Sequence, residues 1–122
     1  ASDVYKRQGL SPSENTSSAD GRGAMVIISL ACYLFLAPLV EEIVFRRLLM
    51  GYLDRSFPAF VSVILSSLLF GAAHIAPPVI VYATFLGMGC ALVTRFHNSL
   101  RAGFILHLVN NLTVQLIAIS AL

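Results

Sequence analysis

Four long apolar stretches follow one another from residue 24 to the C-terminus, separated by short polar or proline-containing breaks. They cover about residues 24–50, 58–75, 79–96 and 100–122. Each is close to or above the ~20 residues that a helix needs to cross a bilayer. The apolar positions do not alternate, and an open sheet cannot satisfy its backbone in lipid. The pattern therefore predicts an all-α integral membrane bundle of about four transmembrane helices.

Prolines punctuate this pattern. Pro58 stands where a helix accepts proline best, at the first turn. Pro77 and Pro78 force a turn between the second and third stretches, and Pro38 is expected to kink the first helix just before two glutamates.

The N-terminal segment differs from everything after it. Residues 1–23 are polar, rich in Ser and Gly, and show no periodicity. Such a composition is typical of a disordered tail, or of a cloning or sequence-assembly scar. The predicted domain division is therefore a polar tail over 1–23 and a transmembrane helical core over 24–122.

The amino-acid composition of the chain is also typical of an integral membrane protein. Hydrophobic residues make up 57% of the chain and charged residues 11%, whereas soluble domains average about 25% charged residues. A formal net charge of +2 is too small to indicate nucleic-acid binding. Five arginines flank the first and third connections: Arg46, Arg47, Arg55, Arg95 and Arg101. The positive-inside rule then predicts cytoplasmic loops at 51–57 and 96–100, with a bacterial cytoplasmic membrane as the expected location.

Two adjacent acids lie in the first apolar stretch. Glu42 precedes Arg46 by four residues, so the two can pair on one helix face. Glu41 has only apolar neighbours at that spacing, which predicts an acid without a partner. Ionisable groups at membrane depth usually serve a function, and such a carboxylate can act as a general base on water. The alternative is structural: both acids reach the interface at a helix end.

His107 and Asn111 form a second polar pair, spaced four residues apart in an otherwise apolar stretch. They project from one helix face and can hold a ligand, a water or a metal together. The alternative is a polar clamp between helices, the role also expected of Asn110.

The other two histidines carry weaker signals. His74 ends an apolar run and on its own is best interpreted as interfacial, with Phe70 one turn earlier able to pack against its ring. His97 stands beside Asn98 and Ser99 and is predicted to be solvated.

The third stretch is predicted to be a packing helix. Ala83, Gly87 and Ala91 recur every four residues, a spacing that lets helix backbones approach closely in a bilayer. Cys32 and Cys90 lie in apolar runs without metal-binding spacing, where a thiol behaves as a small hydrophobe.

Three short motifs thus stand in order, each in an apolar stretch: Glu41-Glu42-x-x-x-Arg46, Phe70-x-x-x-His74 and His107-x-x-x-Asn111. Together they resemble the motifs of the CPBP family, the CAAX-protease and bacteriocin-processing (Abi) intramembrane endopeptidases. The resemblance covers about residues 36–122. It implies an all-helical fold whose catalytic side chains line a cavity within the bilayer.

The resemblance also implies roles for individual residues. Glu41 would activate the hydrolytic water, and His74 would help to bind it. His107 and Asn111 would stabilise the oxyanion of the tetrahedral intermediate. Three further residues would support the site: Glu42, Arg46 and Phe70.

The resemblance leaves the part played by a metal open. Family members are often labelled metalloproteases, and a zinc ion with an open position could be held by Glu41, His74 and His107. A metal-free mechanism is slightly preferred, because the amide of Asn111 is an unusual zinc ligand but a good oxyanion donor.

The expected activity is therefore hydrolysis of a membrane-proximal peptide bond in a prenylated CAAX-type protein, a bacteriocin leader or another peptide. The expected partners are the lipid bilayer and that peptide or prenylated protein; nothing in the chain indicates an oligomeric state. A non-catalytic bacteriocin-immunity or scaffold protein is the alternative, and a proton or ion relay ranks last.

Overall fold

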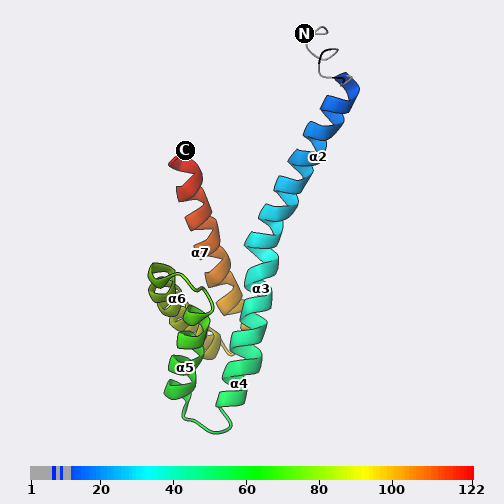
Figure 1. Cartoon of the computed structure of the whole chain (residues 1–122). Helices are drawn as coiled ribbons and strands as arrows, with labels where there is room; N and C mark the ends of the chain where they lie inside the picture. The colour runs from blue at the N-terminus through cyan, green and yellow to red at the C-terminus, as the bar shows by residue number, and fades with distance from the viewer. Residues whose placement is uncertain (1–6, 8, 10–11) are drawn as a thin grey trace. The chain divides into compact units, whose positions relative to one another are not determined.

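The computed structural model describes residues 7, 9 and 12–122. The chain divides into two compact units, Ala1–Tyr33 and Leu34–Leu122. The main element of the first unit is helix α2, Pro12–Ala31 (Figure 1). The predicted tail lies partly outside the described residues. Its described part from residue 12 onward is helical, so the helix begins before the expected start at residue 24.

A proline in the first turn explains that earlier start. Pro12 costs no hydrogen bond there, because the first N–H groups of a helix have no partner within it. Extending a helix that already exists is also far easier than nucleating one, so polar residues can follow the apolar part into helical geometry. The division of the chain at residue 23 stays a prediction.

The second unit is built from helices connected by short turns (Figure 1). In chain order its elements are η1 (Cys32–Leu36, which begins in the first unit), α3 (Ala37–Glu42), η2 (Ile43–Leu49), α4 (Met50–Leu53), α5 (Ala59–Ala72), α6 (Pro77–His97) and α7 (Leu100–Ser120). Helix α5 packs on α6 and α6 on α7, while α3 contacts α7 and η2 contacts α5. Throughout the described residues the structure is helix and turn, without strands.

Length and composition make three helical stretches able to cross a membrane: Ser18–Leu53, Pro77–His97 and Leu100–Ser120. The second predicted stretch, residues 58–75, corresponds to the shorter apolar helix α5. The predicted all-α membrane fold is confirmed, and the chain is an integral membrane protein.

The first of these stretches changes its helical geometry twice around the acid pair. The π-helical segments η1 and η2 lie directly before and after α3, which contains Pro38 and both glutamates. A π-turn is a frequent feature of functional sites and one of the causes of helix kinks. The irregularity expected at Pro38 is thus spread over both flanks of α3.

Helix α5 ends earlier than predicted. It has 14 residues and stops at Ala72, so its length is ~21 Å, less than the ~30 Å of a bilayer core. Ile75 then adopts a left-handed backbone with φ 68°, which a β-branched residue rarely does. Pro77, which opens α6, favours extended geometry at the preceding Ala76, and the chain reverses within this short turn. His74 therefore lies in a turn after α5, not on the helix as expected.

The interior of the second unit is unusually polar. The buried hydrophobic residues are Met50, Val63, Phe70, Ala83, Cys90 and Ala91, and the buried polar or charged ones are Glu42, Arg46, Ser62, Ser66, Ser67 and His107. The hydroxyls of Ser66 and Ser67 donate hydrogen bonds to the backbone carbonyl of Val63, at 3.2 and 2.6 Å. Large apolar side chains lie instead on the outside, the arrangement expected of helices surrounded by lipid.

Glycines permit the close approaches on which this interior depends. A Cβ on Gly71 of α5 would lie 2.8 Å from the carbonyl oxygen of Ile80 and would also strike Thr84 of α6. A Cβ on Gly87 would lie 3.0 Å from the Phe70 ring. The small-residue face predicted for the third stretch is confirmed, since its three members are all buried.

The first and third connections meet at one end of this unit, where Asp54 and Arg95 form an ion pair. Asn98 closes α6 with a left-handed backbone, φ 47°, and the Ser99 side chain caps α7 by accepting from the N–H of Arg101. Two connections on the same end are what an alternating bundle requires. Which side of the membrane they face stays a prediction.

We predict that Gly71→Ala destabilises the fold by about 1–3 kcal/mol, because the new methyl group must push α5 away from α6. Gly51→Ala is the matched control: a Cβ there meets nothing within 4 Å. Thermal unfolding in detergent micelles, followed by circular dichroism, measures both. Equal melting temperatures for the two variants would contradict the close α5–α6 packing.

Candidate functional site

The site is organised around the carboxylate of Glu42, the last residue of α3. Its side chain is fully buried, and each oxygen has its own partner. Oε2 lies 3.3 Å from Nε of Arg46. Oε1 lies 2.9 Å from Nδ1 of His107, which comes from α7. The Glu42–Arg46 pair predicted from the spacing is confirmed.

His107 lies between the two glutamates. While Nδ1 contacts Glu42, Nε2 lies 3.6 Å from Oε2 of Glu41. Glu41 was expected to lack a partner, and that expectation is wrong. The spacing argument considered only neighbours on the same helix, whereas this partner comes from a helix more than sixty residues later.

The two glutamates differ in their access to solvent. The side chain of Glu41 is 34% exposed, whereas that of Glu42 is 0% exposed. An ionised carboxylate only accepts hydrogen bonds, so the short contact places the proton of His107 on Nδ1, where it points to Glu42. Nε2 is then the nitrogen that faces Oε2 of Glu41.

Phe70 is the apolar centre of the cluster and is fully buried. Its ring lies 5.5 Å from the imidazole of His107 and 5.0 Å from that of His74, measured between centroids. The guanidinium carbon of Arg46 lies 4.8 Å from the same ring, a cation–π contact. The predicted packing of Phe70 on His74 is confirmed.

His74 contacts the cluster through this ring. Its Nδ1 donates to the backbone carbonyl of Phe70 at 2.9 Å, which leaves Nε2 as the nitrogen available for other contacts. Across the described part of the chain, the ion pairs of Glu41 and Glu42 run to His107 and Arg46, not to His74.

The asparagines of α7 lie one turn beyond His107. Asn110 accepts a hydrogen bond from the hydroxyl of Tyr82 on α6, which confirms its predicted role between helices. It also donates to Oδ1 of Asn111 at 3.3 Å. His97 is exposed and packs on Phe96, as its predicted solvated position requires.

The structure assembles a different set of metal-type ligands from the one predicted. Among the described residues, one ligand atom each from Glu42, Cys90 and His107 lie within 4.8 Å of one another. This group differs from the predicted set of Glu41, His74 and His107, of which only His107 is a member. Sequence reasoning missed Cys90. A signal was present, since Cys90 follows Gly87 by three residues on the packing face of α6.

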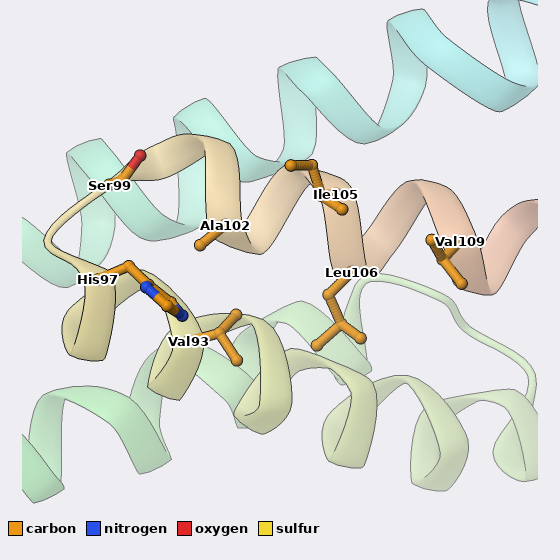
Figure 2. Close-up of a pocket in the computed structure, with 7 residues that line it drawn as sticks. All are labelled: Val93, His97, Ser99, Ala102, Ile105, Leu106 and Val109. Atoms are coloured by element: carbon orange, nitrogen blue, oxygen red, sulfur yellow. The ribbon is translucent and has the colours of Figure 1, made fainter.

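Two hollows flank α6 and α7. A polar cavity of about 260 Å³ is lined by Arg46, Arg47, Met50, Asp54, Thr94, Arg95, Asn98, Ser99 and Leu100. An apolar groove of about 630 Å³ is lined by Val93, His97, Ser99, Ala102, Ile105, Leu106 and Val109 (Figure 2). The larger groove contains none of the predicted catalytic residues, so its size does not mark it as the reaction site.

Residues 23–113 match the family of type II CAAX prenyl endopeptidases described as Rce1-like. The match covers most of the chain and includes all three motifs. The chain belongs to this family. No curated protein and no solved structure matches the chain.

Membership in the Rce1-like family confirms the resemblance drawn from the motifs. At the level of the family, the activity is that of an intramembrane endopeptidase. The Glu42–His107 contact therefore joins the first and third motifs of a membrane protease family.

We predict that Arg46→Met costs about 3–5 kcal/mol of stability, because a buried carboxylate loses its cation. The double variant Glu42→Gln, Arg46→Met should recover part of that loss. Asp54→Asn is the control, since its half-exposed pair with Arg95 contributes at most about 1 kcal/mol. Unfolding in mixed micelles measures all three, and equal losses from R46M and D54N would contradict a buried ion pair.

Proposed function

We propose that the chain hydrolyses a membrane-proximal peptide bond with a water activated by Glu41. The observation that carries the proposal is the position of His107, which contacts both acids of the first motif. The difference in exposure supports Glu41 as the base: its side chain is partly exposed, although Oε2 is buried, whereas the Glu42 side chain is fully enclosed.

The chemistry follows from the positions of these groups. Glu41 takes a proton from a water molecule, and the hydroxide attacks the carbonyl carbon of the scissile bond. The carbonyl oxygen becomes an oxyanion, which accepts hydrogen bonds from the amide of Asn111 and from Nε2–H of His107, whose imidazolium form carries a proton on each ring nitrogen. As the tetrahedral intermediate collapses, the C–N bond breaks and Glu41 returns the proton to the leaving amine.

Glu42 and Arg46 serve as positioning residues in this proposal. The Glu42 carboxylate fixes the ring orientation of His107 through Nδ1 and so directs Nε2 toward Glu41. Arg46 holds the second oxygen of that carboxylate. The same arrangement, a carboxylate that orients a functional histidine, recurs in many enzyme sites.

His74 binds the water or the substrate in this proposal. The buried Phe70 ring contacts both imidazoles and so links His74 to His107. The short helix α5 supports this role, since at ~21 Å it is shorter than the ~30 Å bilayer core and is followed directly by the turn that contains His74. The steps proposed here use Glu41, His107 and Asn111 with water, and the metal-free mechanism stays a prediction.

The family name points to a prenylated protein with a CAAX-type C-terminus as the substrate class. Such a substrate reaches the site from the lipid phase. The proposed location is a bacterial cytoplasmic membrane with the loops at 51–57 and 96–100 on the cytoplasmic side.

The direct test replaces Glu41 by Gln in proteoliposomes and measures shortening of a prenylated CAAX-type peptide by mass spectrometry. We expect the rate to fall by at least ~10²-fold, because the amide cannot accept the proton. Asp20→Asn makes the same acid-to-amide change at an exposed position of α2 and should leave the rate unchanged.

Circular dichroism confirms that each variant retains its helices. An E41Q variant that cleaves at the wild-type rate would contradict the role of Glu41. A folded wild type without cleavage of any membrane-proximal peptide would favour the non-catalytic immunity or scaffold protein.

A further inference from the structure

Cys90 is a buried thiol that the proposed reaction does not use. It lies on α6 with 0% exposure, and its sulfur belongs to the group of three ligand atoms within 4.8 Å of one another. The other two belong to Glu42 and His107, which are also buried. The three residues come from α3, α6 and α7, so only the folded bundle brings them together.

We propose that Glu42, Cys90 and His107 form a binding site for a thiophilic divalent metal ion of the zinc class. A thiolate, an imidazole and a carboxylate are the donors that zinc prefers, and three protein ligands leave a fourth position open. In a tetrahedral zinc site, neighbouring ligand atoms are ~3.5 Å apart. The Glu42–His107 contact of 2.9 Å is close to that value, so mainly the sulfur must approach.

The charges around the cluster suit a divalent cation. The carboxylate of Glu42 and the thiolate of Cys90 balance the two charges of the metal. Arg46 remains ion-paired with the oxygen of Glu42 that does not face His107, and ligating carboxylates in proteins commonly have such a second partner.

Metal binding requires two proton movements. The thiol of Cys90 releases its proton to solvent, since the thiolate is the ligand. The proton of His107 moves from Nδ1 to Nε2, so that Nδ1 can donate its lone pair to the metal. Nε2–H then points to Glu41, whose Oε2 lies 3.6 Å away.

This site differs from the metal set expected from the motifs, because it includes neither Glu41 nor His74. It is therefore independent of whether Glu41 activates water. A metal at Glu42 and Cys90 would hold His107 in a fixed orientation and bind α3, α6 and α7 together.

Cobalt(II) is the probe that tests the proposal, because a bond between Co²⁺ and a thiolate gives an intense near-ultraviolet charge-transfer band. We expect the purified chain in detergent to bind one equivalent of Co²⁺ with this band, and Zn²⁺ to abolish it by displacement. Cys90→Ser should remove the band and weaken binding at least ~10-fold.

Cys32→Ser is the matched control. The chain has two cysteines, and Cys32 is exposed in η1. A wild type that binds Co²⁺ without the thiolate band, or binds none, would overturn the proposal, as would a band that survives C90S. Because the readout is spectroscopic, a failure of proteolysis would leave it unaffected.

A measurement on the wild type alone covers the case in which C90S does not fold. Mass spectrometry can follow the alkylation of Cys90 by a membrane-permeant maleimide. We expect Zn²⁺ to slow this reaction at least ~10-fold relative to Mg²⁺, which binds thiolates poorly. Equal rates in the two ions would overturn the proposal.

Discussion

The burial of one negative charge, the carboxylate of Glu42, is the constraint on which the rest of the unit depends. A carboxylate removed from water is stable only where its oxygens have charged or hydrogen-bonding partners. Arg46 supplies one from the same helical stretch, and His107 supplies the other from α7. The requirement therefore fixes the register of α7 against α3 and η2. The same contact brings His107 to Glu41, so the need to satisfy a buried charge also assembles the candidate site.

The surrounding packing serves this polar centre. In lipid, apolar side chains gain little by being inside, so helices associate through small residues and polar contacts. Gly87 lets α6 approach the Phe70 ring and the guanidinium of Arg46 closely. A Cβ on Gly103 of α7 would lie 2.8 Å from Oε2 of Glu42. The packing of the helices and the formation of the site thus depend on the same residues, since the glycines that permit close packing also lie against the buried Glu42–Arg46 pair.

Much of this was accessible from the sequence. The apolar lengths predicted a helical membrane bundle, and i,i+4 spacing gave the Glu42–Arg46 pair and the Phe70–His74 contact, because both are local. The predictions that failed concerned contacts between residues far apart in the sequence. His107 as a partner of Glu41 and the approach of Cys90 depend on contacts between helices. The early end of α5 depends on the left-handed turn at Ile75, which no propensity favours.

The distance between His107 and the glutamate carboxylates is the quantity that tests the central claim most directly. Solid-state NMR dipolar recoupling in liposomes can measure it between ¹⁵N-histidine and glutamate carboxyl ¹³C. The structure predicts strong dephasing from an imidazole nitrogen of His107, whose Nδ1 lies 2.9 Å from a Glu42 oxygen, and its loss in His107→Gln. Separations beyond ~6 Å for every histidine, well outside hydrogen-bonding range, would contradict the account.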